Sequence, residues 1–470
     1  MAATTPGFSS ANALAVLKES YAEKDVQNLI ERNSPTLAKI NKVPGYGKYY
    51  VVPMMYSRGG AVACDFTKMT ALASTTAQNK AMQVTYGQLF SGFTISPKEH
   101  LASDSDPGAF VQLIREYYFA STEALRKTIG AAIFGMGYGE FAPVKAVDSS
   151  NKLYITISNA GAIGLDVGSN VVFATGPNPD GALRSATASV VSKVVDNGDD
   201  TSTVTFASAY DASVAVGDWV ELYGTRDGSG NPLLFVGLRG WLPIIGNRTG
   251  ATWNTYIGTA FFGVDRSVYP SRLAGQFVLR NNGANEKYSA AIIRGVRASR
   301  RAGGVPDLIV LNDVDFGTVI QEINAVQSQW QAINGPNAGG QLKATQGISS
   351  LMFAFSNTWV QYVIDDPYCP VGIAYVLETD SVAMAMLSNK KPVDAGSAMP
   401  TNNEGGAPKI AETDTPPMIY QWNIDDLLAS APSDTTDGQG ARITTQFFSA
   451  FFIRNPAHCA VIKLDVTLAA

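Results

Sequence analysis

The sequence predicts an α+β protein in which strands, a long helix and a separate β-rich module follow one another along the chain. A strand-like alternation over 48–56 comes first, followed by a helical period over 107–134. Short strand-like runs then recur at close intervals over 142–238, and helices and strands mix over 285–388.

The composition combines many apolar residues with few charged ones. Of the 470 residues, 46% are apolar and only 16% are charged, whereas charged residues make up about a quarter of a usual soluble domain. Much of the surface is therefore covered by something less polar than solvated charges. Subunit contacts are one explanation, because interface cores are depleted in charge. A Gly- and Ser-rich β-protein with a neutral surface is the other.

The formal net charge of −5 argues against tight binding to phosphate groups. The densest basic stretch is Arg294, Arg297, Arg300 and Arg301, whose spacing puts several of them on one helix face. We expect that face to be solvated. The chain shows neither a signal-peptide pattern nor an apolar stretch of about 18 residues. We therefore expect cytoplasmic synthesis and no membrane partner.

Residues 1–10 are small and polar and predict a loose arm. Apolar residues at helical spacing over 11–31 predict an amphipathic helix. Two strand-like runs, 48–56 and 81–86, then flank a weakly apolar stretch and predict an extended hairpin. Because a lone hairpin is marginal in water, another surface should steady it, such as a neighbouring subunit.

The helix over 107–134 has signals at both ends. Asp106 is a good N-cap, and Pro107 occupies the first helical position. Apolar residues follow at spacings of three and four, until Gly135 and Gly137 end the pattern. At about 1.5 Å per residue the helix would be roughly 40 Å long, enough to serve as the backbone of a domain.

Residues 142–238 predict a small inserted barrel or sandwich. Strand-like runs cover 152–157, 187–195 and 201–206, and the last two are joined by the turn signal Asp196–Asp200. The remaining expectations are a helix at 285–303, a buried strand at 306–312, a helix at 314–331, strands within 350–364 and 371–388, a loop at 389–418, and final strands at 441–453 and 460–467.

The sequence contains little that indicates catalysis. Cys64, Cys369 and Cys459 form no CxxC pair, which argues against a disulfide framework or a zinc site. His100 follows Glu99 and is expected to shape a turn. His458 and Cys459 are expected in a strand, where neighbours point to opposite faces and cannot form a dyad.

Two pairs of acids remain, Asp365-Asp366 and Asp425-Asp426, and such pairs more often cap turns or helices than bind cations. The Gly-rich stretch 135–139 follows a helix, whereas a phosphate-binding loop precedes one. We predict no catalytic, cofactor-binding or metal-binding residue, no cofactor, and no enzyme activity.

The order of these elements resembles the major capsid proteins of tailed double-stranded DNA bacteriophages, which have the Hong Kong 97-type capsid fold. A helical arm, an extended hairpin, a long spine helix, a mixed domain and a final long strand follow in that order. The strings that carry the resemblance are 29–35 with 49–55, Lys98–Leu101 with Asp106–Phe110, Gly237–Pro243, Gly263–Ser267, Pro306–Asn312 and Arg454–Ile462.

The resemblance implies seven segments. They are an N-terminal arm (1–45), an extended hairpin called the E-loop (46–97), a peripheral domain with the spine helix (98–141), the β-rich insertion (142–238), the continuation of the peripheral domain (239–284), an axial domain (285–435) and returning C-terminal strands (436–470).

The function that the resemblance implies is that of a structural coat subunit. Subunits would assemble into pentamers and hexamers of an icosahedral head shell around packaged viral DNA, in the virion. Portal, scaffold or decoration proteins would be partners, and the inner face would touch DNA weakly. Some such proteins cross-link neighbours through a hairpin Lys; Lys68 and Lys80 are present, but no matching Asn is evident, and we expect no cross-link.

Other functions remain open. A phage tail protein or another adhesin would explain 142–238 but not the helix at 107–134 or the mixed domain. The shell of a bacterial encapsulated nanocompartment shares the suspected fold, and copurifying cargo enzyme instead of DNA would identify it. An enzyme would lose its turnover when one of the two aspartate pairs is changed.

Overall fold

The computed structural model describes part of the chain. The described residues are 34–45, 47–57, 64–65, 67, 78–95, 121–176, 181–246, 248, 261–281, 285–326, 353–355, 358–360, 362–387, 422–424, 427–429, 433–434 and 441–465. The chain divides into two compact units, the first formed by Met1–Asn33, Leu89–Arg126 and Pro400–Phe447, and the second by Ser34–Gln88, Lys127–Met399 and Phe448–Ala470.

A mixed five-stranded sheet forms the centre of one domain of the second unit. Its order is β12 (Gln276–Leu279), β23 (Ala460–Lys463), β17 (Ile373–Leu377), β13 (Leu308–Leu311) and β16 (Tyr362–Asp365). β12 is parallel to β23 and β13 to β16, whereas β17 is antiparallel to both of its neighbours. Every residue of β13, β17 and β23 is buried, as expected for strands inside a covered sheet.

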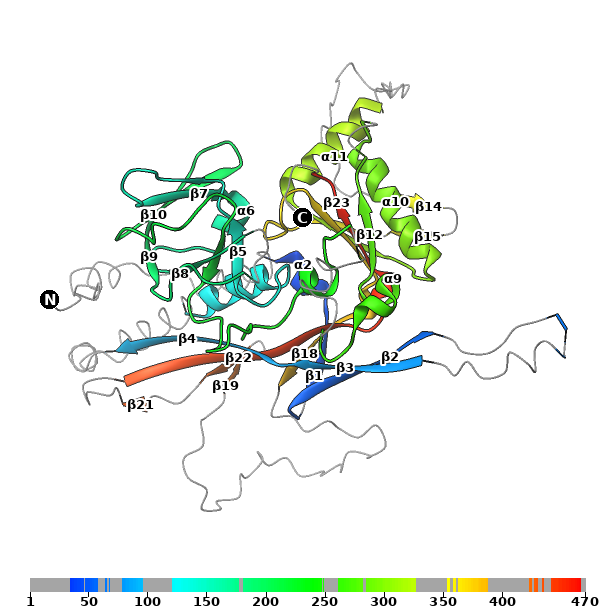
Figure 1. The fold of residues 1–470 in the computed structure, drawn as a ribbon, viewed down its shortest axis with the longest axis horizontal. Coiled ribbons are helices and arrows are strands. Elements are labelled where there is room, and N and C mark those ends of the chain that lie inside the picture. The colour runs from blue at the N-terminus through cyan, green and yellow to red at the C-terminus, as the bar shows by residue number, and fades with distance from the viewer. Residues whose placement is uncertain are drawn as a thin grey trace, which may run out of the picture. The chain divides into compact units, whose positions relative to one another are not determined.

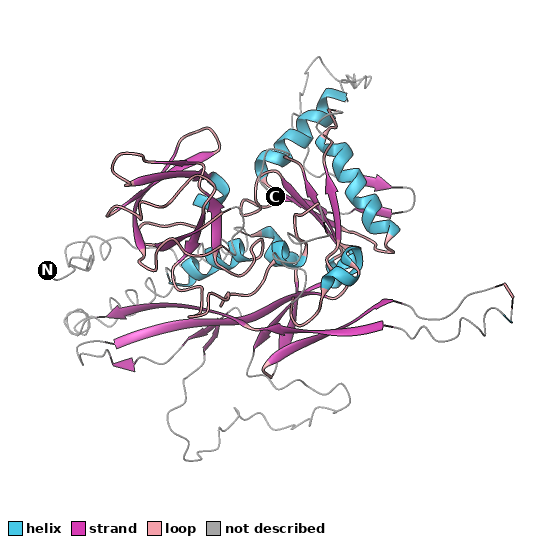
Figure 2. Ribbon diagram, viewed as in Figure 1, coloured by secondary structure: helices cyan, strands magenta, loops and turns pink. Residues whose placement is uncertain are grey.

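Two helices pack on this sheet, as Figures 1 and 2 show: α10 (Tyr288–Arg301) and α11 (Asp313–Val326). α10 buries Ala291, Ile292 and Val296, which share a helix face at spacings of one and four. Its first N–H groups lack partners within the helix. The carboxylate of Glu322 in α11 accepts hydrogen bonds from the N–H groups of Tyr288 and Ser289, at 2.8 and 3.0 Å, and so caps α10.

The insertion is one curled seven-stranded sheet. Its order is β5 (Glu140–Pro143), β11 (Trp219–Leu222), β8 (Asn170–Ala174), β9 (Ser189–Asp196), β10 (Thr201–Phe206), β7 (Tyr154–Ser158) and β6 (Ala146–Val147). The edge strands β5 and β6 are joined only by residues 144–145, whose N–H groups donate to Asp218 on one side and Thr156 on the other. The sheet therefore closes on itself, and α6 (Asn159–Ala162) packs against β5.

The helical residues 121–132 end as the sequence predicts. Gly137 adopts a φ of +98°, which glycine tolerates best. The buried carboxylate of Glu140 accepts hydrogen bonds from the N–H groups of Met136 and Tyr138 just after the helix. Desolvation raises the pKa of Glu140, and these hydrogen bonds oppose that rise. The Gly-rich stretch is thus a helix stop, as expected.

Other elements of the second unit connect these parts. They are α2 (Pro35–Lys39), β1 (Asn41–Gly45), β2 (Tyr49–Ser57), β3 (Gln78–Thr85), α7 (Leu238–Trp241), η2 (Arg266–Val268), α9 (Pro270–Leu273), β14 (Phe353–Phe355), β15 (Thr358–Val360), η4 (Thr379–Ser381), β18 (Val382–Leu387) and η5 (Pro456–His458). β1 lies parallel to β18, and β18 lies antiparallel to the second half of β22 (Ala441–Ile453).

In the first unit, short strands pair with the first half of β22. β20 (Leu427–Ala429) pairs with β22 and with β19 (Trp422–Ile424), and β21 (Ser433–Asp434) pairs with the start of β22. β4 (Gly87–Ile95) also pairs with β22. Among the described residues, no helix has the length and apolar character needed to cross a membrane.

The expected α+β class is confirmed, since helices and several sheets are present. The hairpin strands, the strands of the insertion, the helices near 285–303 and 314–331 and the strand 441–453 are found. Two expectations are corrected. The last strand ends at Lys463, because the N–H groups of Leu464 and Asp465 both donate to Gly372. His458 lies in η5 and not in a strand, because Pro456 begins a helical turn there.

Some predictions fall outside the described residues. These are the loose arm at 1–10, the helix at 11–31, residues 107–120 of the long helix, residues 327–331 and the loop at 389–418.

Candidate functional site

The hairpin formed by β2 and β3 has two unlike faces. The strands pair antiparallel from Tyr49–Thr85 to Met55–Asn79, so side chains alternate between the faces. Val52, Met54 and Tyr56 of β2 are buried on one face, together with Met82 and Val84 of β3. This inner face packs against other residues of the second unit, to which the hairpin belongs.

Three contacts anchor the hairpin there. Tyr50 stacks on Phe452, with ring centroids 4.4 Å apart. The Gln83 N–H donates to the carbonyl oxygen of Phe262 at 3.2 Å. An Nη1–H of Arg272 donates to the carbonyl oxygen of Tyr56 at 2.6 Å. The base of the hairpin is therefore held in place by ring stacking and by backbone hydrogen bonds.

The outer hairpin face consists of Tyr49, Val51, Pro53, Met55, Asn79, Ala81, Gln83 and Thr85, all exposed and none charged. The exposed fractions of Val51 and Met55 are 53% and 63%. Single exposed apolar residues are common, but a row of them on one strand face marks an interaction surface. None of the side chains of this face carries a charge that an apolar partner surface would bury, although the Lys48 ammonium lies 5.1 Å from the centroid of the Tyr49 ring.

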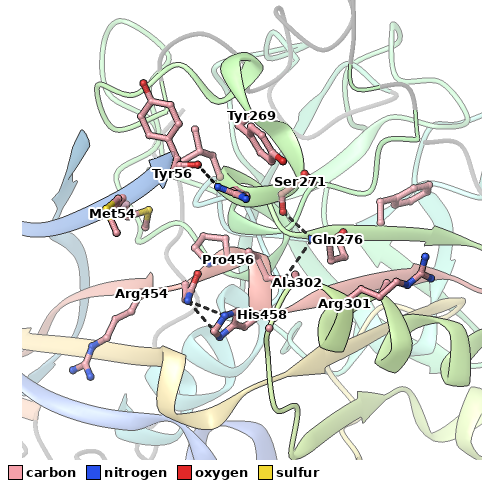
Figure 3. Close-up of a pocket in the computed structure, with 18 of the residues that line it drawn as sticks. Met54, Tyr56, Tyr269, Ser271, Gln276, Arg301, Ala302, Arg454, Pro456 and His458 are labelled. Atoms are coloured by element: carbon pink, nitrogen blue, oxygen red, sulfur yellow. Dashed lines mark hydrogen bonds between the residues drawn. The ribbon is translucent and has the colours of Figure 1, made fainter. Parts of the chain in front are cut away.

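A groove of about 1170 Å³ lies beside the base of the hairpin. Residues 53–56 of β2, the segment 269–279, α10 with the two residues after it, and residues 454–458 contribute to its walls (Figure 3). Its lining includes four arginines, Arg272, Arg294, Arg301 and Arg454, and no Asp or Glu. We call it the arginine groove.

The four arginines differ in how they are held. Arg272 lies over the ring of Tyr269, 4.5 Å from its centroid, and Arg294 pairs with Glu286 at 2.8 Å. Arg301 and Arg454 are exposed, and neither side chain makes a salt bridge or hydrogen bond with any residue that the structure describes. These two guanidinium groups are available to an anion.

His458 also lines the groove, but its ring is engaged. Its Nδ1 lies 2.7 Å from the Glu378 carboxylate, and the Asn455 amide lies 3.0 Å from its Nε2. Cys459 next to it is fully buried, and desolvation raises its pKa to about 12. Because the thiolate is the reactive form, this thiol is unsuited to nucleophilic chemistry.

The aspartate pair 365–366 serves as a cap. Asp365 is exposed at the end of β16, whereas Asp366 is buried and binds the N-terminus of α2. The pair 425–426 and His100 lie outside the described residues, as does Lys68; Lys80 is exposed in β3. Where side chains are described, no group of three or more His, Cys, Asp or Glu could hold a metal ion.

The groove was not predicted from the sequence. Arg294 and Arg301 belong to the basic helix face that was expected to be solvated; Arg301 is exposed, and both residues also line the groove. Arg272 and Arg454 are distant in sequence, and the pairing of β12 with β23 brings their segments together. No local pattern could have signalled that pairing.

No family model matches the chain, and no curated protein matches it. Among solved structures, the chain is similar to the capsid asymmetric unit of cyanophage A-1(L), with 12% identity, a TM-score of 0.49, and coverage of 92% of this chain and 93% of that one. It is similar to a structure of Mycobacterium phage Cain, with 9% identity, a TM-score of 0.39, and coverage of 98% and 99%.

It is also similar to the holo-SrpI encapsulin complex of Synechococcus elongatus, with 8% identity, a TM-score of 0.39, and coverage of 99% and 98%. A phage capsid is thus among the solved structures similar to this chain, as the sequence resemblance predicts.

Proposed function

We propose that this chain is a structural coat subunit that assembles with copies of itself into a closed shell. The observation that carries the proposal is the outer hairpin face, an uncharged row of exposed residues on a hairpin whose other face is anchored to its own subunit. A second chain laid on that face would remove apolar area from water at about 25 cal/mol per Å².

The hairpin is suited to such a role because two strands alone are marginal in water. Its inner anchors fix one end, and a neighbour's surface would stabilise the rest. Permanent interfaces bury about 2,000–5,000 Å² in total. One hairpin face supplies only part of that area, so each subunit would meet several neighbours, and the shell would gain from many contacts at once.

In finer detail, we propose the Hong Kong 97-type arrangement with the seven segments given above. Pentamers and hexamers would form an icosahedral head shell around double-stranded DNA in a virion. Portal, scaffold or decoration proteins would be further partners, and the insertion would face outward. The net charge of −5 fits weak contact with DNA. In this role the chain has no catalytic function.

The test is electron microscopy of the purified full chain in negative stain, with its mass measured by light scattering. Rings, capsomers or closed shells are expected. Val51→Asp should prevent their formation, because it places a charge on the outer hairpin face. Val167→Asp is the matched control, since Val167 is 69% exposed in a turn of the insertion and lies outside the hairpin.

A wild-type chain that stays monomeric, with a rigid and protease-resistant hairpin 46–95, would contradict the proposal. Equal assembly by Val51→Asp would show that the outer hairpin face is not the interface. Shells that copurify with a cargo enzyme and no DNA would identify a nanocompartment in place of a virus head.

A further inference from the structure

We infer that the arginine groove receives the acidic turn Asp196–Asp200 of a second copy of this chain. The inference rests on the proposed function, since it names the contact through which one subunit recognises another. It adds a second interface, of opposite charges, to the uncharged outer hairpin face.

The groove has the chemistry of a site for carboxylates. Its four arginines face no acidic residue of the lining. Arg301 and Arg454 approach from different elements, the end of α10 and the residue just after β22. A guanidinium presents a fork of N–H donors that matches the two oxygens of a carboxylate. Two such groups without an acid of their own can hold a pair of carboxylates.

Apolar and aromatic side chains complete the groove. The Tyr269 ring is 41% exposed beside Arg272, and Met55 belongs to both the groove and the outer hairpin face. The groove is therefore continuous with the uncharged face proposed above as an interface. A neighbouring subunit that covers the hairpin is thus positioned to reach the arginines.

The acidic turn has the complementary chemistry. Asp196, Asp199 and Asp200 are exposed at the tip of the β9–β10 hairpin, and no Lys or Arg occurs between residues 194 and 207. The turn is shaped by its own hydrogen bonds. Asp196 accepts one from the N–H of Gly198 at 2.8 Å, and Asp199 accepts one from the N–H of Thr201 at 3.2 Å.

Asp200 is held with its backbone at a φ of +60°, and its carboxylate makes no salt bridge or hydrogen bond within the part of the chain that is described. The turn is thus a preformed loop that presents carboxylates. A preformed loop loses little conformational freedom when it binds.

A second copy, and not the same chain, is the donor. Within one chain, no described hydrogen bond or salt bridge joins the turn to the groove. A contact between two different patches of identical subunits is head-to-tail. When the rotations between successive subunits add up to a full turn, such contacts form a closed ring. Exposed ion pairs are individually weak. Repeated in every subunit, they fix register and speed association.

Charge reversal in the full-length chain tests the inference, with assembly followed by light scattering at increasing protein concentration. Arg301→Glu and Asp200→Lys should each raise the concentration needed for assembly by roughly tenfold or more, as like charges then meet. One chain that carries both changes should assemble within about threefold of wild type, because every contact then has the pair restored with its signs exchanged.

The controls are Arg297→Glu, an exposed arginine of α10 outside the groove, and Asp166→Lys, an exposed acid elsewhere in the insertion. Both should assemble like wild type. If the two reversals leave assembly unchanged, or if their effects simply add in the double variant, the inference is wrong while the coat function stands. A wild-type chain that never assembles would instead contradict the proposed function.

Fluorescence anisotropy with a labelled oligonucleotide tests the alternative, that the groove binds the phosphate groups of a nucleic acid. Binding that Arg301→Glu abolishes, with assembly intact in that variant, would assign the groove to phosphates and overturn the inference.

Discussion

The carboxylate of Asp366 accepts a hydrogen bond from the backbone N–H of Thr36 at 3.2 Å, across 330 positions of the sequence. The same oxygen lies 3.4 Å from the Ser34 hydroxyl, and the other oxygen binds the Tyr368 N–H at 3.0 Å. Asp366 thus joins the start of α2 to the end of β16.

Asp366→Ala should release α2 from the sheet. The N–H groups of Thr36 and Tyr368 would remain buried without an acceptor, at a cost of about 1–3 kcal/mol. Hydrogen–deuterium exchange should become faster in residues 35–40, and the midpoint of urea denaturation should fall. Asp365→Ala is the matched control, because its side chain is exposed. Unchanged exchange in Asp366→Ala would show that other contacts hold α2.

Much of the local structure could be predicted from the sequence. The strands Thr201–Phe206 and Ala441–Ile453 have the bounds expected from their alternation, and the turn Asp196–Asp200 joins two strands as predicted. In these segments the signal is local: alternation of side chains, turn residues and caps act within a few positions of one another.

What could not be predicted depends on pairing between distant segments. The sheet of the insertion closes on itself because residues 144–145 join its two edge strands. The sequence of that dipeptide does not predict this role. The arginine groove likewise needs β12 beside β23. The pair Asp365-Asp366 was expected to cap a turn or a helix. The helix that Asp366 caps begins near Thr36, and no local sequence pattern links the two segments.

Asp315 should make stability depend on pH. It is buried, and desolvation raises the pKa of its carboxyl to about 6, with Asp465 and Asp313 adding repulsion and the Gly372 N–H opposing the shift. Between its unfolded value near 4 and about 6, the folded state binds more protons than the unfolded state. The free energy of unfolding therefore falls as pH rises through that window.

At about 1.36 kcal/mol per pKa unit, the loss is on the order of 3 kcal/mol. Asp315→Asn keeps an oxygen for the Gly372 N–H and removes the titration, so its stability between pH 4 and 6 should vary less than that of wild type. Urea denaturation at several pH values measures this. Asp380→Asn, at an exposed position and not among the groups that shift the Asp315 pKa, should keep the wild-type slope. Parallel curves for Asp315→Asn and wild type would rule Asp315 out as the source.

The ion pair of Arg226 with Glu221 should be costly to break. The two groups are 2.6 Å apart with side chains 8% and 0% exposed, and Arg226 also lies over the Tyr138 ring. Glu221→Gln leaves a buried guanidinium without a countercharge, a change that costs about 3–5 kcal/mol in comparable pairs. Replacing both residues with Met should cost less than this single change.

Thermal denaturation of the purified chain would compare these variants. Asp166→Asn is the control for an exposed pair, because the Lys127–Asp166 bridge leaves Asp166 55% exposed. It should change stability by no more than about 1 kcal/mol. A Glu221→Gln variant as stable as Asp166→Asn would mean that water reaches the buried pair.

Two glycines should respond in opposite ways to the same change. A Cβ at Gly87 would lie 2.0 Å from the backbone nitrogen of Phe235, so Gly87→Ala forces the start of β4 away from the segment it touches and should destabilise by at least about 1–3 kcal/mol. A Cβ at Gly317, inside α11, meets nothing within 4 Å. Gly317→Ala should therefore stabilise by about 0.5–1 kcal/mol, since alanine loses less backbone freedom in a helix. Urea denaturation midpoints on either side of wild type are expected, and a shift of both variants in the same direction would contradict the close approach at Gly87.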